Sequence, residues 1–315
     1  MTRRLKSASS GQPVPVRAKI GEAARQFGFL WKERGPGKKL DFSRLEIEFQ
    51  EYSDLARRYG NFELTSARVF EIGCGQRPHR LFYLIANQVN AYAIDMDKVM
   101  MSPNLAEIAL TFGKNGLERT VKTVLRRVLF DGAEQKQLRA FLSARAGQPF
   151  EWPLDRISHG SAADPNAWPD GKFDFVLSED VFEHIPADQL HVVCAQIADR
   201  LNERGIALIR PMVFTGIRGG HHVDWYNTSV DSVRKCPPWD HLRENLHPAN
   251  TYLNKLHLAG YRRIFVRHFD IVAEAVKSPW VGKDFLTDQI RQELAPYSEE
   301  ELFSNHVAFV LRRKK

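Results

Sequence analysis

Cysteine is scarce in this 315-residue sequence, which contains only Cys74, Cys194 and Cys236. The three are odd in number, far apart and without Cys-x-x-Cys spacing, which excludes a disulfide scaffold and a structural zinc site and indicates a reducing compartment. Long apolar runs are also missing, since none approaches the ~18 residues that a membrane helix needs. Residues 1–18 lack the apolar core of a secretory signal, although a transit peptide stays open. We therefore predict a cytoplasmic protein without a membrane span.

The body of the chain lacks an excess of basic charge, although the net charge is +7. Arg3, Arg4 and Lys6 supply three of these charges and residues 312–315 supply the other four, so the rest of the chain is neutral overall. A nucleic-acid-binding domain would carry a basic stripe within its fold. We therefore expect both ends to be solvated, and we disfavour nucleic acid as a partner.

The stretch 69–80, Val-Phe-Glu-Ile-Gly-Cys-Gly-Gln-Arg-Pro-His-Arg, has two glycines where a dinucleotide-binding loop has three. Val69–Ile72 is predicted to be a short buried strand, and an apolar helix is predicted at 81–89. Gly73 and Gly75 lie between them, where the absence of a Cβ lets the backbone come close to a ligand. The ligand is then expected at the carboxyl edge of an α/β sheet.

The side chains around this turn disfavour a pyrophosphate. Arg77 stands where the third glycine would be, and Glu71 at the end of the strand would repel a pyrophosphate but could hold an ammonium group. A second predicted strand, 91–94, ends in Asp95, 20 residues beyond Gly75. That distance suits one strand–helix–strand unit, in which the second carboxylate bonds ribose hydroxyls. A ligand with an amine and a ribose but no phosphate fits both carboxylates.

The acidic-x-Gly-x-Gly turn resembles the first motif of the class I S-adenosylmethionine (SAM)-dependent methyltransferases. Two later stretches are similar to the same family, namely Phe173-Asp174-Phe175-Val176 at a predicted fourth strand and Glu183-His184-Ile185 at the entry to a helix. The resemblance spans residues 66–311. It implies an α/β, Rossmann-like fold: a seven-stranded, mostly parallel sheet with helices on both faces and an antiparallel last strand.

The resemblance also implies SAM as the cofactor. The cofactor-binding residues predicted in this way are Glu71, Gly73, Cys74, Gly75, Asp95, Met96, Asp164 and Glu179. The glycine turn and Glu71 would surround the amino-acid part, Asp95 would bind the ribose, and the backbone near Glu179 would line the methionine portion. Adenine would lie against Met96 and Asp164. The sequence departs from the family here, because the usual Gly-Asp pair is Gly160-Ser161 and Asp164 comes three residues later.

Three parts are predicted along the chain: a disordered basic tail at 1–18, a helical cap at 19–65 and a SAM-binding methyltransferase domain at 66–315. The domain would carry helical insertions at about 98–150 and 275–305, together with a lid loop at 212–248. Long irregular loops in compact domains are usually functional or disordered, and the aromatic residues of this one argue against disorder. The cap either closes over the cofactor or simply covers the sheet.

Further elements are predicted from apolar spacing and breaks. They are helices at 121–128, 138–142, 190–201, 248–258 and 285–294 and strands at 155–158, 206–209, 262–269 and 306–311. Gly205 is predicted to cap the helix at 190–201, and Ala259-Gly260-Tyr261 to end the helix at 248–258.

Methyl transfer to an oxygen needs a proton acceptor, and histidine suits this role because its ordinary pKa lies near neutrality. The catalytic candidates are His184 at the helix entry and His221 or His222 in the lid loop, with Asp224 orienting the latter two. The His-His-x-Asp run also suggests a metal. Adjacent histidines on an extended segment point to opposite sides, however, so we predict no metal site.

The leading hypothesis is a SAM-dependent methyltransferase that acts on an oxygen or nitrogen of a small-molecule or carbohydrate acceptor. One alternative is a non-catalytic relative that keeps SAM as a ligand, and another is an NAD-type oxidoreductase. RNA methylation is a fourth, and it would make RNA binding steeply salt-dependent. The sequence predicts neither the acceptor nor the oligomeric state.

Overall fold

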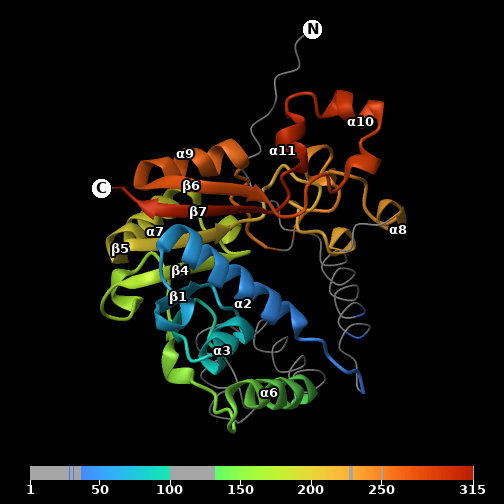
Figure 1. The fold of residues 1–315 in the computed structure, drawn as a ribbon. Helices are drawn as coiled ribbons and strands as arrows, with labels where there is room; N and C mark the ends of the chain where they lie inside the picture. The colour runs from blue at the N-terminus through green and yellow to red at the C-terminus, as the bar shows by residue number, and fades with distance from the viewer. Residues whose placement is uncertain are drawn as a thin grey trace.

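A single seven-stranded sheet organises the computed structural model, which describes residues 37–99, 132–226, 230–249 and 251–314 together with Gly28 and Trp31. The strand order is β3-β2-β1-β4-β5-β7-β6, and β7 runs antiparallel to both of its neighbours while β1 to β5 pair in parallel (Figure 1). The strands are β1 (Arg68–Ile72), β2 (Asn90–Asp95), β3 (Ile157–His159), β4 (Phe173–Glu179), β5 (Leu201–Arg210), β6 (Phe269–Val276) and β7 (Val307–Arg313). This arrangement confirms the predicted fold class.

Helices cover both faces of the sheet because its strands are apolar on both sides. On one face lie α2 (Ser43–Leu55), α3 (His79–Ala86) and α6 (Gly132–Ala146), and on the other α7 (Ala187–Arg200) and α9 (Leu258–His268) (Figure 1). Side chains alternate along a strand. Val69 of β1 therefore packs in the core beneath α2 and α3, whereas Phe70 and Ile72 pack in the core beneath α7 and α9.

The predicted lid and the insertion near the C-terminus share a small core of their own. Ile217, Trp225 and Trp239 from the lid pack with Leu302 and Phe303 from the insertion. Short helices border this core: α8 (Val230–Val233), α10 (Asp288–Glu293) and α11 (Glu299–Phe303). The lid is thus held by apolar burial over its described residues, in line with its aromatic content.

The strand order reverses at β1, which has β2 on one side and β4 on the other. Chain connections leave β1 and β4 in opposite directions, so a crevice opens beyond their carboxyl ends. Ligands of open α/β sheets bind at such a switch point. The topology therefore points to the turns that follow Ile72 and Glu179.

Two adjacent predictions near residue 260 were wrong. No helix is present over the described residues of 248–257: residues 252–257 have no regular secondary structure, Lys255 has a φ of +58°, and Asn254 donates its backbone N–H to the carbonyl oxygen of Glu183 at 2.9 Å. The strand predicted at 262–269 is part of helix α9, and β6 begins only at Phe269. The buried residues Leu258, Tyr261 and Phe265 are spaced three and four apart, as on a helix.

Gly205 does not cap a helix, because α7 ends at Arg200 and Gly205 lies within β5. The register between β4 and β5 shifts here, with Phe173 opposite Leu201 and Phe175 opposite Ile206. A Cβ on Gly205 would lie 3.0 Å from the carbonyl oxygen of Phe173. Glycine is therefore required by close backbone approach at a bulge.

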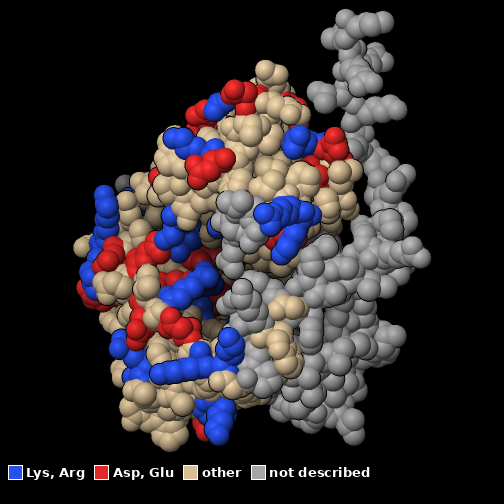
Figure 2. All heavy atoms as spheres, turned by 90° about the vertical axis from the view of Figure 1, so that its right-hand side faces the viewer, with Lys and Arg blue, Asp and Glu red and all other residues tan. Residues whose placement is uncertain are grey.

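The C-terminal basic residues are not all solvated, contrary to expectation. Arg312 and Arg313 end β7 half-buried, and they donate to the backbone carbonyl oxygens of Tyr59 and Leu201 respectively. Acidic and basic side chains are interspersed over the described part of the face in Figure 2. The helix predicted at 121–128 lies outside the described residues.

No described helix has the length and apolar character that crossing a membrane would require.

Candidate active site

The turn after β1 approaches the turn after β4 so closely that it needs glycine. Gly73 and Gly75 have φ angles of +79° and +67°, in the left-handed region that favours glycine. A Cβ on Gly73 would lie 2.2 Å from Cγ2 of Val181. Both glycines therefore have backbone conformations that favour glycine, as the sequence predicted. At Gly73 a further reason is close packing against Val181 at the end of the neighbouring strand.

Asp95 fixes the shape of that turn from the end of β2. Its Oδ2 accepts a hydrogen bond from the backbone N–H of Gly75 at 2.7 Å, and its Oδ1 accepts one from Asp97 at 2.7 Å. Burial raises the pKa of Asp95 despite these two bonds. The carboxylate therefore links the first two strand ends, at the position where a ribose was predicted.

A cavity of ≈ 290 Å³ lies over this edge of the sheet. Its walls come from the ends of β1, β2 and β4, the loop after β3 and the start of α7. The residues that line it include Gly73, Gly75, Asp95, Met96, Ser161, Ala162, Asp180, His184 and Gln189. The cavity thus collects four of the predicted cofactor-binding residues and one predicted catalytic residue.

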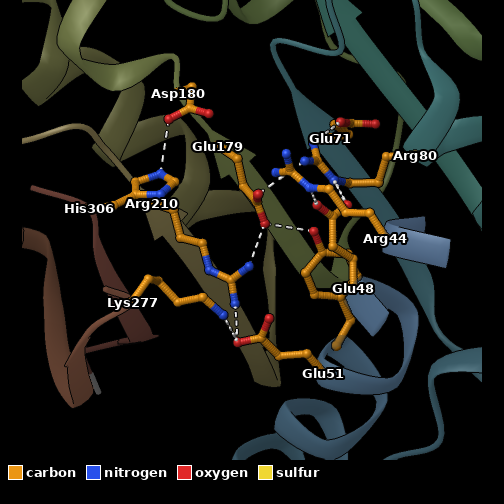
Figure 3. Close-up of polar contacts among 11 residues, drawn as sticks. Arg44, Glu48, Glu51, Glu71, Arg80, Glu179, Asp180, Arg210, Lys277 and His306 are labelled. Carbon is orange, nitrogen blue, oxygen red and sulfur yellow. Dashed lines mark hydrogen bonds and ion pairs between the residues drawn. The ribbon is translucent and has the colours of Figure 1, made fainter. Parts of the chain in front are cut away.

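On the α2 and α3 face of the sheet, a buried ion network ties these two helices to the strands (Figure 3). Arg80 of α3 donates to Glu71 at 2.7 Å and to Glu179 at 3.0 Å, and Arg210 of β5 donates to Glu179 at 2.6 Å. The phenol of Tyr52 donates to Glu179 at 2.6 Å. Burial alone would raise the pKa of Glu179, but the charges of Arg80 and Arg210 outweigh it and hold that pKa below its usual range.

Glu71 and Glu179 therefore serve the ion network and lie outside the cavity lining. Strand alternation explains this, because both side chains point to the α2 and α3 face. One oxygen of Glu71, Oε2, is buried without a hydrogen-bond partner among the described residues, and burial raises the pKa of this carboxyl.

Three side chains meet where the cavity borders the lid: Glu183, His184 and His221. Nε2 of His221 lies 3.7 Å from Oε1 of Glu183, and the two imidazole rings meet edge to face with centroids 4.9 Å apart. Burial lowers the pKa of His221 to about 4 and raises the pKa of Glu183 well above its usual range. His221 also has a left-handed backbone, with φ of +53°. Such strain in a non-glycine residue is often found at functional sites.

His222 and Asp224 form a separate pair within the lid and do not line the cavity. Nδ1 of His222 lies 3.3 Å from Oδ2 of Asp224, and the His222 ring packs against that of His247 with centroids 5.4 Å apart. The two adjacent histidines do point to different surroundings, as predicted. Asp224 is therefore placed to orient His222 and not His221.

A family model described as a methyltransferase domain matches residues 44–260, more than half of the chain. The chain belongs to this methyltransferase family. It is a SAM-dependent methyltransferase, as the first-motif turn and the Glu183-His184-Ile185 stretch predicted, and SAM is its methyl donor. The family assignment excludes the NAD-type oxidoreductase considered for the glycine turn.

The solved structures to which the chain is similar are distant in sequence. A Pyrococcus horikoshii protein is 13% identical with a TM-score of 0.45 over 92% of this chain and 99% of its own. The magnesium protoporphyrin IX methyltransferase of Synechocystis, solved with bound SAH, is 15% identical with a TM-score of 0.43 over 94% and 99%. A SAM-dependent methyltransferase from Clostridium acetobutylicum is 9% identical with a TM-score of 0.44 over 93% and 100%. No curated protein matches the sequence.

Two predicted residues of the methyltransferase lie beside the cavity without lining it. Cys74 is buried, and its Sγ lies 3.7 Å from the carbonyl oxygen of Gly75. Asp164 is exposed and accepts a hydrogen bond from the backbone N–H of Asn166 at 3.0 Å, which caps a short 3₁₀ turn. Sequence reasoning missed Ser161 and Ala162, which line the cavity instead. The signal was available, because Ser161 follows Gly160 where the family pattern has an aspartate.

Proposed function

We propose that this methyltransferase moves the methyl group of SAM onto an oxygen of a small-molecule or carbohydrate acceptor. The observation that supports this proposal is a single cavity with Asp95 at one part of its wall and His184 at another. A carboxylate suits the ribose hydroxyls of the cofactor, and an imidazole suits a hydroxyl that must lose its proton. The two groups thus divide the cavity into a cofactor side and an acceptor side.

In this proposal the cofactor lies over the glycine turn. The ribose binds Asp95, the adenine lies between Met96 and the Ser161–Ala162 turn, and the amino-acid part follows the backbone of Gly73 and Gly75. Each of these residues lines the cavity. The buried network around Glu179 holds the strand ends in place from below, so these contacts are positioned before the cofactor binds.

The chemistry is a displacement at the methyl carbon. An acceptor oxygen forms a bond to that carbon, the carbon–sulfur bond breaks, and the sulfur keeps the electron pair. The proton that leaves the hydroxyl goes to His184 or, through it, to solvent. The protein contributes position and electrostatics, since the sulfonium already activates the methyl group. We propose oxygen over nitrogen because a neutral amine attacks without prior loss of a proton and would give His184 no role as a base.

The test is methyl transfer from radiolabelled SAM to fractions of a cell extract, followed by identification of the labelled product. An O-methylated small molecule or sugar is the expected product. An N-methylated product or labelled RNA would contradict the acceptor proposal while leaving the methyltransferase assignment intact.

A further inference from the structure

We propose that Glu183, His184 and His221 bind a divalent transition-metal ion at the acceptor side of the cavity, where the ion holds the acceptor hydroxyl. This inference deepens the proposed function and rests on it for the identity of the acceptor atom. The three residues can each offer one ligand atom, and these atoms lie within 4.8 Å of one another. The donor set, two imidazoles and a carboxylate, suits first-row transition metals.

Buried polar atoms of this cluster lack hydrogen-bond partners among the described residues. Glu183 is only 3% exposed, and neither of its carboxylate oxygens has a partner in hydrogen-bond geometry among the described residues, although the nearby backbone N–H groups of Glu183 itself and of Met212 act to lower its pKa. Nε2 of His221 is likewise buried and without a partner there. Burying a carboxylate without a compensating bond costs several kcal/mol, so such a group either holds a proton or is met by a cation. A cation between Glu183 and His221 meets both groups at once.

The distances fit a site that contracts slightly on binding. Metal bonds to carboxylate and imidazole of about 2.0–2.2 Å place neighbouring ligand atoms roughly 3–3.5 Å apart. Oε1 of Glu183 and Nε2 of His221 are 3.7 Å apart. Only small side-chain shifts would therefore bring these two ligands to a common ion.

His184 is already oriented as a metal ligand. Its Nδ1 lies 2.9 Å from the carbonyl oxygen of Tyr252. Since a carbonyl only accepts, Nδ1 carries the proton and Nε2 keeps its lone pair. Metal-bound histidines usually donate their second ring nitrogen in this way, which fixes the tautomer and the ring orientation. The amide of Asn254 donates to the carbonyl oxygens of Phe182 and Ile185 and so holds the turn that carries Glu183 and His184.

A second group with suitable atoms, Cys236, Asp240 and His247, provides the contrast. The carboxylate of Asp240 accepts backbone N–H groups from Leu246 at 3.1 Å and from His247 at 2.8 Å. It closes a loop of the lid and is satisfied by the chain itself. Nδ1 of His247 also has no hydrogen-bond partner among the described residues, so the two groups differ in whether the carboxylate is satisfied, and this group serves as the matched control.

Three protein ligands leave open positions on the ion. Because His184 also lines the cavity, those positions face the place where the acceptor must lie. A hydroxyl bound to the metal loses its proton more readily, as water does on zinc. The oxygen then attacks the methyl carbon, the sulfur takes the carbon–sulfur electron pair, and the hydroxyl proton passes to solvent. With Nε2 of His184 bound to the ion, the metal replaces His184 as the group that promotes loss of the hydroxyl proton, and this one step of the proposed function changes accordingly.

The test is a titration of the chelator-treated full-length protein with Co²⁺ alone, followed by calorimetry and by visible absorption. One Co²⁺ per chain with ligand-field bands is the expected result. Glu183→Gln and His221→Asn should each weaken Co²⁺ binding at least 100-fold, whereas His247→Gln should bind as the wild type does. Absence of Co²⁺ binding to the wild type would overturn the proposal, and so would loss of binding in His247→Gln with retention in Glu183→Gln.

The wild-type arm needs no substitution, so misfolding of a variant does not obscure the outcome. SAM binding to the same chelator-treated protein distinguishes failure of the metal proposal from failure of the proposed cofactor placement. SAM binding without Co²⁺ binding rejects the metal and keeps the methyltransferase, whereas absence of SAM binding rejects the cofactor placement itself.

Discussion

Two buried groups of charged side chains lie at the same edge of the sheet and differ in the hydrogen-bond partners of their carboxylates. Glu179 ends β4 and has Arg80, Arg210 and Tyr52 as partners within hydrogen-bond distance (Figure 3). Glu183 follows four residues later, and neither of its carboxylate oxygens has a partner in hydrogen-bond geometry among the described residues. A closed network positions elements of the fold, whereas an open carboxylate in a buried place is poised for a ligand.

Arg210→Met should cause the largest loss of stability, because it removes one of the cations that neutralise Glu179. Arg210 is 3% exposed and joins Glu179 to Glu51. Methionine keeps much of the volume but leaves the carboxylates with fewer cationic partners, so we expect a loss of about 3 kcal/mol in the free energy of unfolding. Urea unfolding followed by circular dichroism measures it.

Arg262→Met is the matched control for that change. Arg262 pairs with Glu274 and Glu300 at the surface, where an ion pair contributes about 0–1 kcal/mol. Equal losses for the two variants would mean that burial does not distinguish the network from a surface pair.

The cofactor side of the comparison is tested by Asp95→Ala. We expect SAM affinity to fall by about 1–3 kcal/mol, because the variant loses a charged hydrogen-bond acceptor for the ribose and also the acceptor for the N–H of Gly75. Calorimetry with SAM measures the change. Asp95→Asn keeps one oxygen for Gly75 and should lose less, and an unchanged affinity in a folded Asp95→Ala protein would remove Asp95 from the site.

Two half-buried lid histidines, His221 and His241, sharpen the contrast between satisfied and unsatisfied groups. Burial lowers the pKa of both His221 and His241 to about 4, but only His241 has its Nε2 bonded to a carbonyl oxygen, that of Phe214 at 2.8 Å. A histidine whose folded-state pKa lies below its ordinary 6.5 takes up a proton first in the unfolded state. Its contribution to stability is complete above pH 6.5 and is lost as the pH falls towards 4.

Lowering the pH from 7 to 5 should therefore cost about 2 kcal/mol for His241 alone. His241→Gln keeps a donor for the Phe214 carbonyl but cannot titrate, so its stability should fall by that much less over the same pH range. Urea midpoints of the two chelator-treated proteins at both pH values give the comparison. Identical pH slopes would show that His241 does not remain neutral in the folded protein.

Features that depend on a short stretch of sequence could be predicted, whereas features that depend on tertiary contacts could not. The glycine turn and Asp95 could be predicted because the two short apolar strands, the glycines between them and the 20-residue spacing from Gly75 to Asp95 all lie close together in the sequence. Residues 248–269 could not, because the predicted helix at 248–258 is irregular over its described residues up to 257 and the predicted strand at 262–269 is helix α9 up to His268. Leu258, Tyr261 and Phe265 carry a helical period, but the run Ile264-Phe265-Val266 within them also looks like a strand.

The acceptor side shows the other limit of sequence reasoning. Glu183-His184 and His221 lie far apart in the chain and meet only because the lid folds onto the turn after β4. The His-His-x-Asp run drew attention to His222 and Asp224, which pair with each other inside the lid. Glu71 and Glu179 were predicted to surround the cofactor, but both lie outside the cavity lining, and their arginine partners Arg80 and Arg210 carry no local signal. Tertiary contacts assign these roles.

The smallest expected effect concerns the adenine end of the cavity, where two polar residues compete for one role. Asp164 is exposed and caps a 3₁₀ turn, whereas Ser161 lines the cavity next to Met96. Asp164→Ala should change SAM affinity by less than about 0.5 kcal/mol, since a lost cap acts on stability and does not remove a ligand contact. Ser161→Leu should weaken SAM binding more, because the larger side chain narrows the space for the base. Calorimetry on both variants decides, and the reverse order would place the adenine against the Asp164 side of the loop.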